Sequence, residues 1–293
     1  MGNTLNSFVN RRALLRKLSI WRLCAIIFFM LLAFKLLSPK DWSILQYDYV
    51  AQIWIEGFIS DNYELEQSLN DILHDSRIKA LIVNINSPGG TFVGGEKLYS
   101  TLKKISERKP TVALLGDQAT SAAYLLALGT NHIIAHQGTL TGSVGVILQS
   151  FEVTELAKKV GITPIILKSS PLKGTPHPVE KLTTEGTSYL QELVDNSQEI
   201  FMKIVKERRK DIAELQLLDI KQGKLYIGVQ AKENNLVDAL GGRDQAIEWL
   251  NNKNIVTDII KDININKNKT NIRDIFKSLN FINNINYKLL SIL

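Results

Sequence analysis

The central part of the chain alternates between short apolar runs rich in β-branched residues and segments of helical spacing. Leu98, Leu102 and Ile105, for example, recur at the spacing of one helical face. This alternation predicts an α/β fold whose sheet is parallel or mixed and whose strands are joined by crossover helices. The predicted strands are residues 50–55, 80–85, 111–115, 132–135 and 163–167.

The second half of the chain contains one long amphipathic pattern, which predicts a helix over residues 184–209. We expect its apolar face to pack on the core. The chain is accordingly divided into a basic N-terminus with an apolar stretch (1–40), a folded body (41–250) and a tail rich in Asn, Ile and Lys (251–293), to which no chemistry is assigned. The residues expected on the buried face of the helix are Leu190, Leu193, Val194, Phe201, Ile204 and Val205.

An apolar stretch from Leu18 to Leu37, uninterrupted between Leu23 and Phe34, has only Arg22 and Lys35 as charges near its ends. About twenty such residues suffice for a transmembrane helix. Five Arg or Lys residues precede or open the stretch, so the positive-inside rule predicts a cytoplasmic N-terminus and an extracytoplasmic body. No small-residue cleavage site follows, which favours a retained single-pass anchor over a signal peptide. Because the uninterrupted run is short, a helix lying on the membrane surface is the alternative.

Composition narrows the class of protein. With 293 residues, 45% hydrophobic and 22% charged, the chain is typical of a globular enzyme. Its net charge of +6 comes from the two ends, since residues 1–40 and 251–293 are basic while the body is slightly acidic. Nucleic-acid binding is not expected, because the body has no basic stripe interleaved with aromatic residues. The single Cys24 excludes an internal disulfide and a cysteine-based zinc site.

Two segments that follow predicted strands could carry chemistry. Residues 84–90 run from a strand into Pro88-Gly89-Gly90, and paired glycines leave backbone N–H groups accessible, as an oxyanion hole requires. A tight turn explains the same pattern. In the second segment, Ser121 begins a run of small helix formers, where a helix N-terminus would favour a developing anion. A serine at this position is also a common N-cap.

Lysine and histidine are the candidate bases. A lysine acts as a general base only where burial disfavours its ammonium form, and Lys173, flanked by Leu172 and Gly174, could meet that condition. His132 and His136 would share one side of a strand without a third metal ligand nearby, so we expect them to be structural. The sequence contains no Gly-x-Ser-x-Gly elbow, P-loop or Rossmann glycine pattern.

Five segments in order, together with the N-terminal apolar stretch, resemble the signal peptide peptidase A family of membrane-anchored serine proteases in its short form, which includes the SohB-type peptidases. The resemblance covers roughly residues 50–250. It implies a ClpP/crotonase-like fold of repeated ββα units, hydrolysis of peptides and no cofactor or metal. The segments are VNINSPGG, TSAAY, TGSVGVI, KSSPLKG and KLYIGVQAKENNLVDALGG.

The resemblance also implies roles for individual residues. Ser121 matches the family nucleophile and Lys173 its general base, while Ser143 matches a serine that orients the lysine amine. The N–H groups of Gly90 and Ala122 would form the oxyanion hole. Lys168, five residues before Lys173, is the rival base.

Two departures from the family pattern concern this site. The usual Ser-Gly-Gly-Tyr is here Ser121-Ala122-Ala123-Tyr124, and the usual Lys-Ser-Gly-x-x-Lys is here residues 168–173. Alanine can still donate its N–H, so the change is compatible with activity, although it alters the side chains around the oxyanion hole. The resemblance to short-form members also implies that the serine and the lysine of one site come from two neighbouring protomers. The protein would then be a homo-oligomer, and a monomer would be inactive.

The expected function is therefore that of an endopeptidase on the bacterial inner membrane, with its body on the periplasmic or extracytoplasmic side, degrading hydrophobic peptides such as released signal peptides. Two alternatives stay open. One is a Ser/Lys peptidase that trims a specific membrane protein, and the other is a non-catalytic anchored oligomer on the same scaffold. A crotonase-type acyl-CoA enzyme is a weaker third, since coenzyme A is cytoplasmic.

Overall fold

The computed structural model describes residues 21–23, 25–30 and 47–263. The chain divides into two units, residues 1–47 and 48–293. In the first unit, residues 21–23 and 25–30 are helical. No helix among the described residues is long and apolar enough to cross a membrane. Much of the apolar stretch 18–37, on which the predicted anchor rests, lies outside the described residues, so the anchor stays a prediction.

The second unit is built on a mixed sheet with the strand order β6-β5-β3-β2-β1-β8, and β4 and β7 branch from β3. All strand pairs are parallel except β5 with β6. β3 is long enough to pair with β4 through its first half and with β5 through its second half. The strands are β1 (Tyr49–Glu56), β2 (Ile78–Ser87), β3 (Thr111–Thr120), β4 (His132–Ala135), β5 (Leu140–Gly142), β6 (Leu225–Ile227), β7 (Ala239–Leu240) and β8 (Ile260–Asp262).

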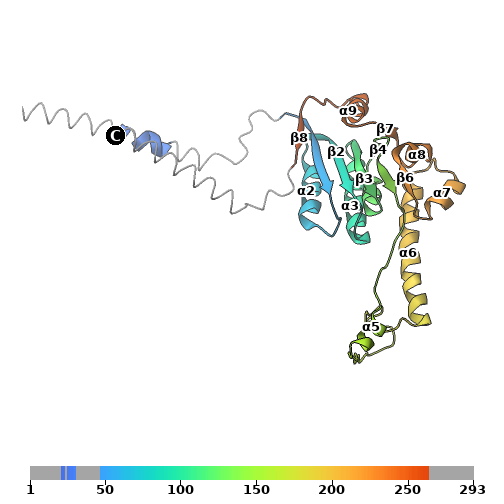
Figure 1. The fold of residues 1–293 in the computed structure, drawn as a ribbon. Helices are drawn as coiled ribbons and strands as arrows, with labels where there is room; N and C mark the ends of the chain where they lie inside the picture. The colour runs from blue at the N-terminus through green and yellow to red at the C-terminus, as the bar shows by residue number, and fades with distance from the viewer. Residues whose placement is uncertain (1–20, 24, 31–46, 264–293) are drawn as a thin grey trace, which may run out of the picture. The chain divides into compact units, whose positions relative to one another are not determined.

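Helices cover both faces of this sheet (Figure 1). One face carries the larger apolar cluster, to which α2, α3, α4 and α6 contribute, and the other is covered by α9 through Ala246 and Leu250. β8 lies in the segment expected as a tail and pairs with β1. The helices are α2 (Tyr63–His74), α3 (Phe92–Ser106), α4 (Ala122–Ala127), α5 (Thr154–Lys159), α6 (Thr184–Arg208), α7 (Glu214–Ile220), α8 (Gly228–Glu233) and α9 (Arg243–Asn252).

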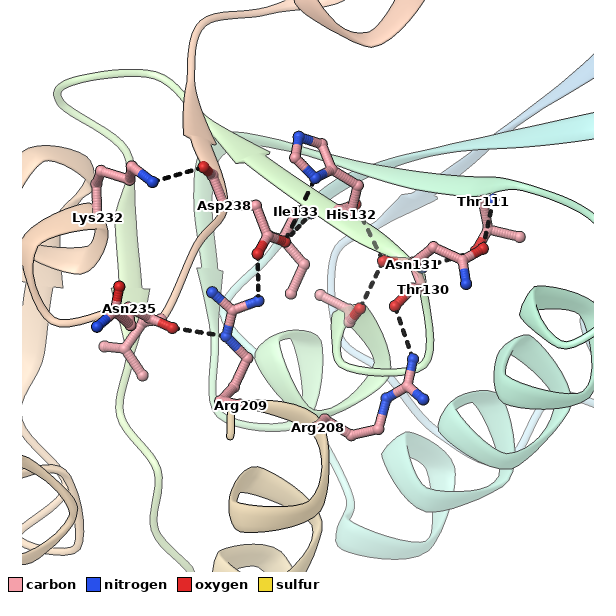
Figure 2. A network of polar contacts seen from close by, with 12 residues as sticks. Thr111, Thr130, Asn131, His132, Ile133, Arg208, Arg209, Lys232, Asn235 and Asp238 are labelled. Carbon is pink, nitrogen blue, oxygen red and sulfur yellow. Dashed lines mark hydrogen bonds and ion pairs between the residues drawn. The ribbon is translucent and has the colours of Figure 1, made fainter. Parts of the chain in front are cut away.

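Two arginines at the end of α6 fasten this helix to the sheet layer (Figure 2). Arg208 donates to the carbonyl oxygens of Leu128 (2.7 Å) and Thr130 (2.9 Å), which follow α4. Arg209 donates to the Asn235 carbonyl and forms an ion pair with Asp238 at 2.7 Å. Carbonyl groups left unpaired at helix ends are thus satisfied by guanidinium donors.

Asp238 connects this network to β4. Its other carboxylate oxygen accepts a hydrogen bond from the Ile133 N–H at 2.7 Å and lies 3.8 Å from the His132 ring. The His132 ring stacks on Trp249 of α9 with centroids 5.0 Å apart. Burial lowers the pKa of His132. The positive charges of Arg209 and Lys232 lower it further, whereas the negative charge of Asp238 raises it. These contacts support the structural role expected for His132.

Most predicted elements are present, and two expectations need correction. The predicted strand 163–167 is wrong, since these residues form no strand and Ile165 and Leu167 are 86% and 95% exposed. The expectation for α6 holds for Phe201, Ile204 and Val205, which are buried in the core. In its N-terminal half Leu190 is buried as expected and Val194 is half-buried, whereas Leu193 is 42% exposed.

The N-terminal half of α6 projects away from the sheet together with α5 (Figure 1). We call residues 146–183 the arm. Its own contacts hold it together, such as the hydrogen bond from the Val153 N–H to the Pro178 carbonyl at 2.7 Å and the ion pair of Lys181 with Glu155 at 3.1 Å. Apolar side chains in the arm therefore have few partners within the described part of the chain, which explains their exposure.

Candidate active site

A cavity of about 630 Å³ collects several of the residues singled out in the sequence. We call it the site cavity. It lies where the loop after β2, the start of α4, the segment after β5 and the middle of α6 meet. Its lining residues are Phe58, Pro88, Gly89, Gly90, Ser121, Ser143, Gly145, Val146, Ile147, Val194, Asp195, Gln198, Lys221, Gln222 and Gly223.

Ser121 sits at the N-cap of α4 in an unusual backbone conformation, with φ of 55° and ψ of −121°. Positive φ is uncommon for residues other than glycine, and such strain is concentrated at functional sites. The Ser121 side chain makes no capping hydrogen bond. Its backbone is nevertheless held, since its N–H donates to the Gly142 carbonyl at 2.9 Å and its own carbonyl accepts from the Leu125 N–H at 2.9 Å. The strained serine is thus fixed by its backbone, while its hydroxyl is free of the capping role.

The glycine pair after β2 packs directly on this serine. A Cβ at Gly89, which has φ of 104°, would lie 2.8 Å from the Thr120 carbonyl oxygen and 2.9 Å from the Ser121 Cβ. A Cβ at Gly90 would lie 1.8 Å from the Ile59 carbonyl oxygen. Only glycine fits at these positions, because a side chain at Gly89 would push the loop away from Ser121 and one at Gly90 would collide with the backbone of Ile59.

Two backbone N–H groups beside Ser121 have no hydrogen-bond acceptor among the described residues. The loop is pinned by bonds from the Ile59 N–H to Gly89 and from the Thr91 N–H to Ile59, and these leave the Gly90 N–H unpaired. The Ala122 N–H is the first of α4, where no intrahelical acceptor exists. Unpaired donors next to a serine at a helix N-terminus can stabilise an oxyanion.

Ser143 faces the same cavity and also has a positive φ, 49°. Its N–H donates to the Lys224 carbonyl at 2.8 Å. Just before it, Gly142 packs on the Tyr226 ring, where a Cβ would approach a ring carbon to 2.7 Å. Tyr226 is itself fixed by a hydrogen bond to Asp219 at 2.9 Å. Burial and the Asp219 carboxylate raise the pKa of Tyr226 to about 12, so the phenol remains a hydrogen-bond donor at neutral pH.

Gln198 of α6 was not found from the sequence. Its amide nitrogen donates to the carbonyls of Val144 (3.1 Å) and Lys221 (3.2 Å), and so ties the segment after Ser143 to the loop after α7. The Gln198 Oε1 is buried and has no partner among the described residues. Gln198 lies one helical turn after Val194 and belongs to no recognisable motif. Its partner Val144 is 54 positions away, so no local pattern in the sequence points to this contact.

The two candidate lysines are placed away from Ser121 within one chain. Lys173 is exposed on the arm and is not among the residues that line the site cavity. Lys168 forms an ion pair with Glu180 inside the arm. The lysine of the same chain that does line the site cavity is Lys221. Of the predicted residues, the structure therefore brings Ser121, Ser143 and Gly90 together with the adjoining Ala122, and leaves Lys173 apart.

The family model for peptidase family S49 matches residues 103–257, just over half of the chain. The chain belongs to peptidase family S49. The matched part includes Ser121, Ser143 and Lys173 and begins after Gly90. Within the described residues, no group of three or more His, Cys, Asp or Glu is arranged to hold a metal ion.

Individual S49 relatives agree with this assignment. The chain is 37% identical over 177 residues to a Synechocystis protein named as a candidate protease, slr0021, covering 60% of this chain and 64% of that one. It is 31% identical over 192 residues to an Enterococcus faecium protein named as a candidate signal peptide peptidase SppA, covering 65% and 55%. This chain thus spans less than two thirds of either relative. A solved structure of the membrane-bound stomatin-specific protease 1510-N aligns with 74% of the chain at 14% identity and a TM-score of 0.46.

Proposed function

We propose that this S49 protein is a serine endopeptidase in which Ser121 is the nucleophile and Lys173 the general base. The lysine amine takes the hydroxyl proton as the Ser121 oxygen attacks the peptide carbonyl, and it then protonates the leaving amine. Water hydrolyses the resulting acyl-enzyme by the same route. The N–H groups of Gly90 and Ala122 hold the oxyanion, and Ser143 orients the amine.

The observation that carries this proposal is the state of Ser121. A serine that serves only as an N-cap would bond its hydroxyl to the first turn of α4, and the Ser121 side chain does not. It is instead held at positive φ on the wall of a cavity, beside two unpaired N–H groups. Strain of this kind costs about 1–3 kcal/mol and persists where the surrounding structure enforces it.

The base is proposed to come from a second copy of the chain. Lys173 lies on the arm, whose apolar side chains include Ile147 at 87%, Ile165 at 86% and Leu167 at 95% exposure. Several large apolar side chains exposed on one segment are typical of a protein–protein interaction surface. A neighbouring protomer that covers the arm would bury this surface. Lys173 of the first protomer would then lie beside Ser121 of the neighbour, where burial removes water from the amine, as a general base requires.

The substrate class follows from the walls of the site cavity. Phe58, Val146, Ile147 and Val194 are apolar and line it together with glycine backbone. We therefore propose hydrophobic peptide segments, such as released signal peptides, as substrates. The apolar stretch after a basic N-terminus supports an anchor in the bacterial inner membrane, with the body on the extracytoplasmic side. The name of the Enterococcus faecium relative is consistent with this substrate class.

Hydrolysis of a fluorogenic hydrophobic peptide by purified variants tests the catalytic roles. Ser121→Ala should lower kcat by about 10⁴-fold or more, and Lys173→Ala should do the same. Lys168→Ala and Lys221→Ala serve as matched controls, because each removes a different candidate amine. Loss of activity in Lys221→Ala alone would move the base to the same chain, and full activity of Ser121→Ala would refute the nucleophile.

Mixing two inactive variants tests the second copy. Chains with Ser121→Ala keep Lys173, and chains with Lys173→Ala keep Ser121, so a mixed oligomer contains complete sites only if these sites form between copies. Activity well above that of either variant alone is expected after subunit exchange. Absence of recovery from a verified mixed oligomer would place both groups in one chain.

A further inference from the structure

A second cavity, of about 260 Å³, lies on the sheet face that α9 covers and shares no lining residue with the site cavity. We call it the α9 cavity. It lies over the middle of β1 and β3 and the second half of β2, beside the N-terminus of α9. Its lining residues are Gln52, Trp54, Asn84, Ile85, Asn86, Leu114, Leu115, Gly116, His136, Gly241, Gly242 and Arg243.

The floor of the α9 cavity contains two buried side-chain amides whose hydrogen bonding is incomplete within the described residues. Gln52 is only 5% exposed, and its side chain makes no hydrogen bond to any described residue. It lies on the same strand face as Val50, which packs under α9, so its amide points into the cavity rather than into the larger core. On the next strand Asn84, 9% exposed, donates to the Ile53 carbonyl at 3.1 Å, and its own oxygen has no donor among the described residues.

Buried polar groups in folded proteins are almost always paired with protein, water or ligand. The Gln52 amide is not sealed in the interior, since it does not belong to the fully buried unpaired atoms. It therefore faces space that a polar group can enter. Two amides on neighbouring strands offer both donors and acceptors, which is the pattern that a peptide group recognises.

The rim of the α9 cavity carries positive charge. Arg243 is the first residue of α9, and its guanidinium is exposed without an ion pair to any described residue. The helix N-terminus adds a partial positive charge in the same place. His136 packs on Gly242, where a Cβ would approach its ring to 2.9 Å, so the glycine lets the imidazole close this side of the cavity. A carboxylate is the group that such a rim favours.

The walls of the α9 cavity are apolar, which indicates that the ligand also has an apolar side chain. Trp54 and Leu114 flank the buried amides. Trp54 is 52% exposed, and its indole N–H donates to Asp262 at 3.3 Å; Asp262 itself does not line the α9 cavity. The volume suits one bulky residue and not an extended peptide. A carboxylate, one peptide group and an apolar side chain together describe the C-terminal residue of a peptide.

We propose that the α9 cavity binds the free C-terminal residue of a peptide that ends in an apolar amino acid. The carboxylate is bound by Arg243 and the α9 N-terminus, the peptide group by Gln52 and Asn84, and the side chain by Trp54 and Leu114. The site is separate from Ser121 and does not depend on the proposed peptidase activity.

Titration with N-acetyl-L-leucine tests this site, with N-acetyl-L-leucinamide as the probe that lacks the carboxylate. Calorimetry gives the affinity, and the indole N–H resonance of Trp54 reports where the probe binds. We expect the carboxylate probe to shift that resonance and to bind at least tenfold more tightly than the amide. Binding that leaves the Trp54 resonance unchanged, or equal binding of the two probes, would overturn the proposal.

Variants make the test specific. Arg243→Gln removes the charge from an exposed position and should weaken binding of N-acetyl-L-leucine at least tenfold, whereas Lys206→Gln on α6 is the matched surface control and should not. Gln52→Leu should weaken binding and raise the melting temperature, because it removes an unpaired amide. Unchanged affinity in both Arg243→Gln and Gln52→Leu would refute the site, and the Ser121→Ala variant should bind as the wild type does.

Discussion

Removing the side chain of Ser121 should stabilise the protein while it abolishes catalysis. Ser121 has φ of 55° and ψ of −121°, a conformation that costs a residue with a Cβ about 1–3 kcal/mol. Ser121→Gly relieves this strain, and the greater freedom of glycine in the unfolded chain takes back about 0.4–1 kcal/mol. We therefore expect the free energy of unfolding to rise, by up to about 2.6 kcal/mol.

Ser121→Ala separates strain from capping. Alanine keeps the Cβ and loses only the hydroxyl, and that hydroxyl makes no capping hydrogen bond, so stability should change by less than about 0.5 kcal/mol. True N-caps behave differently. Thr91 accepts a bond from the Gly94 N–H at 3.1 Å, and Asn62 from the Leu65 N–H at 3.0 Å, so Thr91→Ala and Asn62→Ala should each cost about 1 kcal/mol.

The assay is urea unfolding of the four variants at one protein concentration, followed by far-UV circular dichroism and compared at equal m-values. The expected order of stability is Ser121→Gly above wild type and Ser121→Ala, with the two capping variants lowest. A loss of about 1 kcal/mol in Ser121→Ala would show that the hydroxyl caps α4. A destabilised Ser121→Gly would show that the backbone at this position is not strained. Either result would remove the observation on which the nucleophile assignment rests.

Three further predictions concern the body of the protein. The Arg77 guanidinium lowers the pKa of Asp75 to about 2, so this pair stabilises the fold above the ordinary carboxyl pKa of about 4 and is lost as the pH falls from there towards 2; Asp75→Asn should flatten acid unfolding in that range. Burial lowers the pKa of His132, so the folded protein should lose stability as the pH falls below about 6.5, and His132→Gln should remove that slope from a plot of unfolding free energy against pH. The Tyr124 hydroxyl donates to the Leu236 carbonyl at 2.9 Å in the core, so Tyr124→Phe should cost about 1–3 kcal/mol in urea unfolding, and an unchanged midpoint would contradict this bond.

The sheet could be predicted because its strands are apolar runs whose side chains pack in the core of the same chain. β1, β2, β3 and β4 contain the predicted segments, and their buried side chains explain why the pattern was legible. Residues 163–167 have the same pattern without forming a strand, because nothing among the described residues covers Ile165 and Leu167. An apolar run in a sequence indicates that the segment is buried, but it does not indicate whether the covering surface belongs to the same chain or to a partner. In the arm, this difference decides whether a strand forms.

The candidate site was predictable as far as local motifs reach. The glycines after β2 and the serine before α4 lie at chain positions where strand, turn and helix meet, and the structure brings them to one cavity. The positive φ of Ser121 could not be read from the sequence, since residues other than glycine seldom adopt it. Gln198 could not be found either, because its contacts with Val144 and Lys221 arise from tertiary packing of α6.

The central claim is that Ser121 is a nucleophile activated by a lysine. Its most direct test is labelling of the full chain with a fluorophosphonate probe, followed by mass-spectrometric assignment of the modified residue. We expect one adduct on Ser121 in the wild type, and its loss in Lys173→Ala while circular dichroism and oligomeric state stay unchanged. Wild-type oligomer that hydrolyses peptides while Ser121 stays unmodified, or an adduct on a different serine, would contradict the account.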